Sequence, residues 1–424
     1  MPADVKHFDV IIIGAGPAGC TAALKLAPSG LKIALVDKDP LPKEKVCGDA
    51  LSGTVMDVLR RLPEDAYTSF LQIPGILPSW GIRFVAPGSE ILDVPFVRKK
   101  NDLTPVPGVT CKRLEFDRFL LSRIDKYPNV SVLSGTHTRN VELSSSGDLI
   151  IVSGDNFHFD GKVVIGADGL NSFVARQLAG HKPDSRNLCL GVRGYYKGVS
   201  RFHPDNFIEL HFIRELLPNY LWIFPMQEGI ANVGLGLMPA QVKDNHSSPA
   251  AKLEEILSSH PGLRDRFAHA QPIGKLETHG LPVGYDNRKI SGTRFLLTGD
   301  AASLVDPFTG EGIGNAMLSG EIAAKHISSA FEQNDFSGDH FSEYDREISR
   351  KIGQEIRLSK KIRKFAAYPG LFNFVVKKSN SSNKLKDLLC MMYSDAAMRK
   401  KLTDPWFYLM MVIDPLKTSS SYKP

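Results

Sequence analysis

The chain has 424 residues, of which 42% are hydrophobic and 23% are charged. This length is too great for one simple hydrophobic core, so we expect two or three domains. The composition is that of a globular protein. No stretch approaches the roughly 18 consecutive apolar residues of a membrane-spanning helix, which excludes a helical integral membrane protein.

The net charge of +6 is unevenly distributed along the chain. Residues 346–424 contain 17 lysines and arginines against 6 aspartates and glutamates, so the remainder carries a net charge of −5. The N-terminal segment runs directly into an apolar strand and lacks the pattern of a secretory signal. The cysteines are odd in number and lack metal-ligand spacing, so we expect a cytoplasmic protein with reduced thiols and no metal site. They are Cys20, Cys47, Cys111, Cys189 and Cys390.

The chain begins with the pattern of a dinucleotide-binding fold. An apolar strand over 10–13 leads into a glycine turn and a helix, and a second strand over 31–36 ends in Asp37. The turn consists of Gly14, Ala15, Gly16, Pro17, Ala18 and Gly19. Its first glycine permits a tight turn, its second lets the backbone approach a pyrophosphate, and its third lets helix and strand pack closely. The phosphates then lie at a helix N-terminus, and Asp37 accepts hydrogen bonds from ribose hydroxyls. This motif alone admits NAD as well as FAD.

Two further glycine-rich motifs follow predicted strands later in the chain. The first is Val164-Ile165-Gly166-Ala167-Asp168-Gly169. The second is Leu297-Thr298-Gly299-Asp300-Ala301-Ala302, followed by Gly310-Glu311-Gly312-Ile313-Gly314. A strand that ends in Gly-Asp can direct a carboxylate at the hydroxyls of a sugar alcohol. The later glycines can open a helix whose N–H groups face an anion.

The ordered set of three motifs resembles the large FAD-dependent family that includes p-hydroxybenzoate hydroxylase, the flavin-dependent halogenases and the geranylgeranyl reductases. The resemblance covers about residues 8–330. It implies that Asp37 binds the adenosine ribose, Asp300 the ribitol, and Gly312 and Ile313 the flavin ring. It also places Arg113 next to the cofactor, although an arginine that merely begins a surface helix is the alternative. The expected cofactor-binding residues are Gly14, Gly16, Pro17, Ala18, Gly19, Asp37, Lys38, Cys47, Gly48, Ala50, Arg113, Asp168, Asp300, Gly312 and Ile313.

The predicted elements divide the chain into three parts with an α/β architecture. A Rossmann-type FAD-binding domain comprises residues 1–75, 105–185 and 275–330. Residues 76–104 and 186–274 form an inserted mixed β-sheet domain that binds substrate. Residues 331–424 form a helical C-terminal region.

Two sequence features resemble the geranylgeranyl reductases in particular. Lys45-Val46-Cys47-Gly48-Asp49-Ala50 is similar to the Cys-Gly turn that approaches the flavin in that family. Tyr220-Leu221-Trp222-Ile223-Phe224-Pro225, with Gly234-Leu235-Gly236 after it, is similar to their YxWxFP and GxG elements. Aromatic side chains at alternating strand positions point to one face, so Tyr220, Trp222 and Phe224 can form an apolar wall for a prenyl chain. Ordinary sheet core is the alternative for each of them. Pro218 departs from the pattern, since it lies one residue closer to Tyr220 than these reductases usually have it.

The resemblance implies an FAD-dependent reductase that saturates C=C bonds of a geranylgeranyl-type chain on a lipid, a quinone or an isoprenoid. Cys47 is the expected catalytic proton donor, with a purely structural turn residue as the alternative. An unactivated alkene develops positive charge on carbon as the proton arrives, which a water-free apolar pocket suits. The sequence has no second GxGxxG after a strand. We therefore expect NADPH, NADH or ferredoxin to act as a transient electron donor.

Two other functions fit parts of the pattern. A monooxygenase or halogenase acting on an aromatic compound shares the flavin motifs. However, Tyr220 and Phe224 depart from the related WxWxIP element of the halogenases, and no lysine matches theirs. A prenyl carrier without turnover, like the Rab escort proteins, would leave Cys47 and the complete flavin motifs without a purpose.

The basic C-terminal region predicts peripheral contact with a membrane at the cytoplasmic face, where a hydrophobic prenyl-lipid substrate is available. Its cations alternate with apolar and aromatic residues, a composition typical of segments that lie in a membrane surface. A helical region with a buried apolar run is the alternative, and we expect no nucleic-acid partner. The residues concerned are Lys360, Lys361, Arg363, Lys364, Phe365, Tyr368, Leu371, Phe372, Phe374, Val375, Val376, Lys377, Lys378 and Trp406–Ile413.

Overall fold

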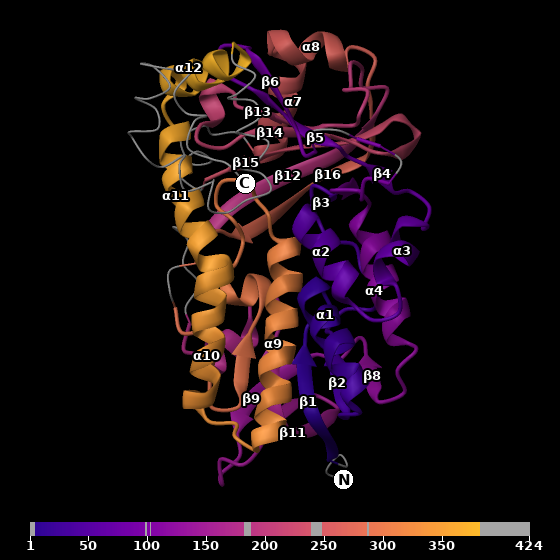
Figure 1. Ribbon diagram of the computed structural model, residues 1–424, viewed down its shortest axis with the longest axis vertical. Helices are drawn as coiled ribbons and strands as arrows, with labels where there is room; N and C mark the ends of the chain where they lie inside the picture. The colour runs from indigo at the N-terminus through magenta and orange to yellow at the C-terminus, as the bar shows by residue number, and fades with distance from the viewer. Residues whose placement is uncertain are drawn as a thin grey trace.

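The computed structural model describes residues 5–97, 100–101, 103–181, 188–238, 248–285 and 288–381. Two large β-sheets lie at opposite ends of an elongated molecule, and long helices run along one side of both (Figure 1). This arrangement confirms the predicted fold class. Trp406–Ile413 and Cys390 lie outside the described residues.

The first sheet contains the predicted dinucleotide-binding strands. Its central strands are parallel in the order β18-β11-β1-β2-β8, with β17, β10 and β9 added antiparallel at the margins. Most residues of β1, β2, β11 and β18 are buried, which explains their apolar runs. Their bounds are β1 Lys6–Ile13, β2 Ile33–Val36, β8 Val130–Leu133, β9 Thr138–Leu143, β10 Ile150–Gly154, β11 Phe157–Gly166, β17 Ser291–Gly292 and β18 Phe295–Leu297.

The second sheet is mixed, in the order β16-β12-β15-β14-β13-β5-β6. Its strands β13 and β5 pair in parallel, which joins two segments far apart in the sequence, and the other pairs are antiparallel. The bounds are β5 Gly81–Val85, β6 Ile91–Pro95, β12 Leu188–Lys197, β13 Ile208–His211, β14 Leu221–Pro225, β15 Ile230–Leu237 and β16 Gln271–Pro282. Strand β16 continues past residue 274, where the sequence predicts a return to the first domain. The division into domains stays a prediction.

Helices cover both sheets. Helices α1 and α9 pack closely against each other beside the first sheet, while α10, α11 and α12 continue along the molecule to the second sheet (Figure 1). A three-stranded sheet, in the order β3-β7-β4, lies between the two large ones. The helices are α1 Pro17–Leu26, α2 Gly53–Arg61, α3 Ala66–Leu71, α4 Arg113–Ile124, α5 Phe173–Leu178, α7 Pro249–Ser259, α8 Pro261–Phe267, α9 Ile313–Gln333, α10 Gly338–Ile348, α11 Gln354–Ala366 and α12 Pro369–Asn380. The short strands are β3 Ala50–Leu51, β4 Leu77–Pro78 and β7 Val109–Thr110.

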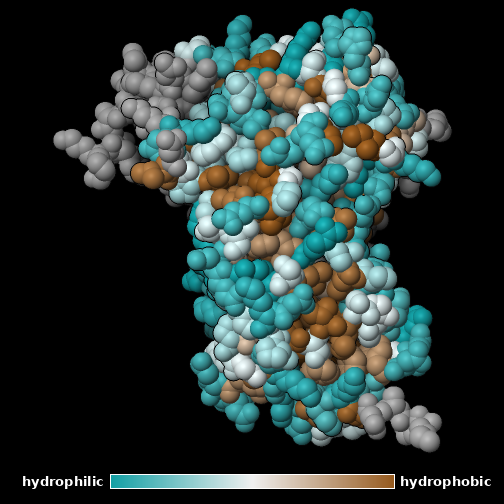
Figure 2. All heavy atoms as spheres, turned by 90° about the vertical axis from the view of Figure 1, so that its right-hand side faces the viewer, coloured by the Kyte–Doolittle hydropathy of each residue, from teal (hydrophilic) through white to brown (hydrophobic). Residues whose placement is uncertain are grey.

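The surface mixes hydrophilic and hydrophobic side chains. On the face shown in Figure 2, hydrophobic side chains gather in patches along the middle, with hydrophilic ones around them. Within the described part of the chain, no helix combines the length and the apolar character needed to cross a bilayer. The cysteines described there, Cys20, Cys47, Cys111 and Cys189, are free thiols.

A buried ion pair stabilises the second sheet. Glu209 of β13 is fully buried, and both of its oxygens accept hydrogen bonds from Arg266 of α8, at 2.5 and 3.0 Å. His211 Nε2 lies 2.9 Å from the same carboxylate. Although burial alone would raise the pKa of Glu209, hydrogen bonds from His211 and Arg266 lower it below its ordinary value. The carboxylate is therefore charged in the folded protein at neutral pH and depends on its partners.

Arg266→Ala is expected to lower the free energy of unfolding by about 3–5 kcal/mol, because it leaves the Glu209 charge buried and without its main partner. The matched control is Arg264→Ala on the same helix, whose pair with Asp265 is mostly exposed; it is expected to cost less than about 1 kcal/mol. Urea unfolding of both variants gives the comparison. Equal losses in the two variants would contradict a structural role for the buried pair.

Candidate active site

The glycine turn after β1 leaves no room for side chains at its first and last positions. Gly14 has φ +107°, and a Cβ there would lie 2.2 Å from the carbonyl oxygen of Ala167. A Cβ on Gly19 would lie 1.9 Å from the carbonyl oxygen of Gly14. Gly16, in contrast, has nothing within 4 Å of its Cβ position, so its outer side is open to a ligand. Helix α1 begins directly after it, and no side chain among the described residues caps that N-terminus. The turn thus has the form of an anion site.

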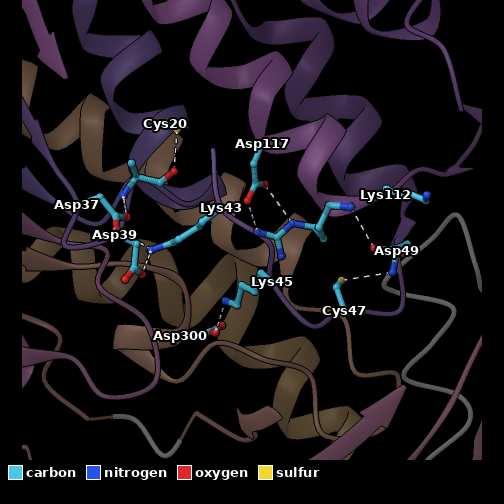
Figure 3. A network of polar contacts seen from close by, with 12 residues as sticks. Cys20, Asp37, Asp39, Lys43, Lys45, Cys47, Asp49, Lys112, Asp117 and Asp300 are labelled. Atoms are coloured by element: carbon cyan, nitrogen blue, oxygen red, sulfur yellow. Dashed lines mark hydrogen bonds and ion pairs between the residues drawn. The ribbon is translucent and has the colours of Figure 1, made fainter. Parts of the chain in front are cut away.

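Asp37 lies at the end of β2, beside this turn. It is buried, and its carboxylate accepts a hydrogen bond from the Ala15 N–H at 2.9 Å. Its other oxygen accepts hydrogen bonds from Lys43 Nζ at 2.6 Å and the Asp39 N–H at 3.0 Å (Figure 3). The adjacent Lys38 is exposed. The predicted contact of Asp37 with a ribose would therefore share the carboxylate with Lys43.

The two later Gly-Asp motifs differ in what their carboxylates do. Asp168 accepts hydrogen bonds from Ser172 Oγ and the Phe173 N–H, both at 2.5 Å, and so caps helix α5. Asp300 lies half-buried after β18, and its nearest cation is Lys45, at 3.3 Å (Figure 3). The Asp300 carboxylate makes fewer contacts within the chain than that of Asp168, so Asp300 is the better candidate for a ribitol contact.

Helix α9 begins at the predicted flavin-facing residues. Gly312 precedes its first turn, Ile313 is the first helical residue, and the Gly314 N–H donates to Glu311 Oε1 at 2.6 Å. Burial raises the pKa of the Glu311 carboxyl. A Cβ on Gly314 would lie 2.8 Å from Thr54 Cβ, so the start of α9 packs closely against α2.

The Cys47 turn lies between the two large sheets. Cys47 Sγ accepts a hydrogen bond from the Asp49 N–H at 3.4 Å, and the Arg113 guanidinium lies near the same sulfur. Burial raises the pKa of the Cys47 thiol, the Asp49 charge adds to this, and Arg113 acts in the opposite direction. The thiol is therefore protonated at neutral pH. A Cβ on Gly48 would lie 3.0 Å from the Phe224 ring, which brings the turn against the second sheet.

Arg113 is a buried residue, and not the surface arginine of the alternative interpretation. Its guanidinium forms a two-point ion pair with Asp117, at 2.9 and 3.1 Å, one turn further along α4. Burial lowers its pKa, but the charge of Asp117 and the hydrogen bonds to that carboxylate more than offset this and raise it. Its backbone N–H donates to Asp49 Oδ1 at 3.1 Å (Figure 3).

Asp49 is the central residue of a buried network that the sequence analysis did not select. It is fully buried, with φ +62°, and its second oxygen accepts hydrogen bonds from Tyr195 Oη at 2.5 Å and Asn232 Nδ2 at 2.9 Å. Asn232 also donates to the Cys47 carbonyl at 2.8 Å and accepts from Trp222 Nε1 at 2.9 Å. Burial raises the pKa of the Asp49 carboxyl despite these donors. The one sequence feature that points to Asp49 is its position in the Cys-Gly turn, directly after Gly48.

The predicted aromatic residues lie on one face of the second sheet, as their alternation predicts. Tyr220, Trp222 and Phe224 all join the aromatic cluster around Phe212 and Phe308, whereas the intervening Leu221 and Ile223 pack with the opposite core under α7. The Tyr220 hydroxyl donates to the Thr309 carbonyl at 2.6 Å, which ties this face to the loop before α9.

The GxG element explains how the Trp222 ring fits. Gly234 lies opposite Trp222 in the sheet, and a Cβ there would lie 2.3 Å from the indole ring.

His279 is a second residue that the sequence patterns did not indicate; it lies in β16, opposite Gly191. Burial lowers the pKa of its imidazole, and the nearby charges of Lys45 and Arg113 add to this while Asp300 opposes it. His279 is therefore a neutral residue close to the predicted flavin contacts.

Comparisons with known proteins agree with this geometry. The family described as "FAD binding domain" matches residues 7–330. The digeranylgeranylglycerophospholipid reductase of Methanocaldococcus jannaschii is 32% identical over 365 residues, which cover 84% of this chain and 86% of that protein. The chain belongs to the geranylgeranyl reductase family of FAD-dependent oxidoreductases.

Solved structures share the fold of this chain. A geranylgeranyl bacteriochlorophyll reductase-like protein from Thermoplasma acidophilum has a TM-score of 0.77 and 25% identity, covering 94% of this chain and 99% of that one. A flavin-dependent brominase has a TM-score of 0.71 and 20% identity, covering 92% of this chain and 93% of its own, which shows a shared fold alone.

The residues present fit FAD, the cofactor of this family. The open side of Gly16 and the uncapped start of α1 suit its pyrophosphate. Asp37 offers a hydrogen-bond acceptor for the hydroxyls of the ribose, and Asp300 offers one for those of the ribitol. The individual contacts stay predictions, including those of Ala50, which lies at the start of β3 directly after Asp49.

The protein is expected to purify yellow with FAD bound non-covalently, and Asp300→Ala to raise the dissociation constant of FAD about ten-fold, because a charged hydrogen-bond acceptor is lost. Titration of the apoprotein, followed by flavin fluorescence, measures this. Asp57→Ala, which removes an exposed carboxylate on α2, is the control and should leave binding unchanged. A colourless protein that takes up no added FAD would overturn the cofactor assignment.

Proposed function

We propose that the protein saturates C=C bonds in the geranylgeranyl-type chain of a lipid, a quinone or an isoprenoid. The observation that carries this proposal is the position of the Cys47-Gly48 turn. A buried network holds it against the aromatic face that contains Trp222 and Phe224. The names of the relatives support the same class of substrate.

When bound, the reduced flavin supplies hydride to one alkene carbon. The protein's own residues supply the proton and the environment. Cys47 gives its thiol proton to the other carbon, and Arg113 stabilises the thiolate that remains until water restores the proton. The raised pKa of Cys47 keeps the proton available at neutral pH. Trp222 and Phe224 exclude water from the alkene, on which positive charge develops during protonation.

Asp49 holds the turn in place and is not itself required to transfer a proton. Its carboxylate accepts hydrogen bonds from the second sheet through Tyr195 and Asn232, and from α4 through the Arg113 N–H. We propose that this fixes the distance from the thiol to the aromatic face. We also propose that NADPH, NADH or ferredoxin would serve as a transient electron donor to the bound flavin.

The function is tested under anaerobic conditions with dithionite-reduced enzyme and geranylgeranyl diphosphate. Mass spectrometry is expected to show stepwise gains of two hydrogens. Cys47→Ser is expected to retain FAD and its reduction by dithionite but to reduce the alkene at least about 100-fold more slowly, since general-acid catalysis contributes factors of this size.

Two outcomes would contradict the proposal. Full prenyl reduction by Cys47→Ser would remove the thiol from the mechanism and leave Cys47 as a turn residue. Oxygen consumption coupled to turnover of an aromatic compound, with no prenyl reduction, would favour the monooxygenase or halogenase alternative.

We also propose peripheral membrane contact through the C-terminal helices, where such a substrate would be collected. Lys361, Lys377 and Lys378 are exposed on α11 and α12, and Tyr368 between the helices is 65% exposed. The apolar run of α12 contributes less than the sequence alone suggests. Its Phe372 packs against Phe212 of the second sheet, with ring centroids 4.4 Å apart.

The full-length protein is expected to float with vesicles that contain anionic lipid at low salt. Reversing Lys361, Lys377 and Lys378 to glutamate should abolish flotation, because each basic residue contributes about 1 kcal/mol at such a surface. Reversal of the exposed Lys6, Lys32 and Lys162, which lie in or next to strands of the first sheet, is the control with the same charge. Failure of the unmodified protein to float, or equal loss in both triple variants, would contradict this membrane surface.

A further inference from the structure

A cleft of about 530 Å³ lies beside helix α11, apart from the flavin-binding motifs. Its walls come from four segments: Pro218 before β14, Val283 after β16, Pro307 before α9, and one side of α11. The charged side chains that line it are all cationic: Lys360, Arg363 and Lys364. An apolar pocket with converging cations is suited to a ligand that has an anionic end and a hydrophobic body.

Arg363 is the unusual residue of this cleft. It is half-buried, its Nη2 donates to Asn219 Oδ1 at 3.3 Å, and its Nε is buried with no hydrogen-bond partner among the described residues. No described carboxylate lies within ion-pair distance of it. Burial lowers the pKa of its guanidinium, which nevertheless remains charged at neutral pH.

The three fully buried arginines among the described residues show the contrast. Arg113 pairs with Asp117, Arg266 with Glu209, and Arg193 with Glu277, each at 3.0 Å or less. A buried charge without a partner is costly, and an anion from outside the chain would relieve that cost at Arg363. Guanidinium groups bind phosphate in a two-point geometry, and the neighbouring lysines would add to the attraction.

The cleft borders the aromatic face of the candidate active site. Pro307 is followed by Phe308, and Pro218 lies two residues before Tyr220. The rings of Phe308 and Tyr220 both lie within 6 Å of the Phe212 ring, centroid to centroid. The same cluster includes Trp222 and Phe224, against which the Cys47 turn packs. A ligand with its polar end in the cleft would thus have an apolar surface leading toward the thiol.

We propose that this basic cleft binds the phosphate end of the prenyl substrate, with Arg363 as the main contact and Lys364 and Lys360 beside it. The inference rests on the proposed function and restricts its substrates: a chain that ends in a phosphate or diphosphate is bound, and a neutral alcohol or quinone of equal length lacks this contact.

The experiment compares three ligands on the full-length, FAD-loaded protein by calorimetry: geranylgeranyl diphosphate, geranylgeraniol and inorganic pyrophosphate. Arg363→Gln is expected to weaken geranylgeranyl diphosphate about ten-fold or more, the size of a charged hydrogen bond, and to leave geranylgeraniol within about two-fold. The KM for the diphosphate should rise in parallel while kcat stays unchanged. Lys162→Gln is the control with the same loss of charge, because Lys162 is exposed and does not line the cleft.

Three results separate the possibilities. Equal weakening of the diphosphate and the alcohol by Arg363→Gln would mean a structural role and overturn the proposal. An effect on inorganic pyrophosphate alone would make the cleft a site for free phosphate and also overturn it. The unmodified enzyme could instead bind the prenyl diphosphate through Arg363 but reduce none of its C=C bonds. That result would support the cleft as a phosphate site and reject the proposed function. If Arg363→Gln does not fold, Lys364→Gln at an exposed position provides the same comparison.

Discussion

The candidate active site depends on one buried carboxylate. Asp49 accepts hydrogen bonds from the backbone of α4 and from two side chains of the second sheet, so it links three parts of the chain that are distant in sequence. A buried carboxylate with several donors is stable only while those donors stay in place. If the second sheet moved away from α4, the Asp49 carboxylate would either become exposed to solvent or stay buried without its hydrogen-bond donors. The network therefore makes the position of the Cys47 turn depend on how the two large sheets are held together.

The electrostatics of the turn follow from the same arrangement. Burial and the Asp49 charge raise the pKa of Cys47, while Arg113 opposes them from the other side. The resulting neutral thiol differs from the low-pKa cysteines that act as nucleophiles beside cations. Asp117 offsets part of the Arg113 charge, so the thiol stays neutral until it gives up its proton. A proton donor and a nucleophile can thus be built from similar residues, and the partner of the arginine decides between them.

Local sequence patterns predicted the parts of the structure that depend on local geometry. Gly14 and Gly19 are required because other chain atoms lie within 3 Å of any Cβ there, and the alternation in β14 separates two cores. Contacts across the fold could not be predicted in this way. Asn232 and Tyr195 reach Asp49 only because β12 and β15 pair in one register, and no local pattern reports that register. Asp168 shows the limit of a local motif. Its Gly-Asp pattern predicts a cofactor contact, but in the structure its carboxylate accepts hydrogen bonds at the start of α5.

Helix α11 connects the two ends of the proposed substrate site. Asp306, in the loop before α9, lies beside Ser359 of α11, and that helix carries Arg363 one turn further along. The loop also receives the Tyr220 hydroxyl from the second sheet. A phosphate held at Arg363 and a thiol held by Asp49 would both be fixed relative to the same loop. With both ends fixed, only one stretch of a prenyl chain can lie beside the thiol. Saturation of several double bonds in one chain would then require the phosphate to leave the cleft between steps, so affinity for the phosphate end would limit how many bonds are reduced.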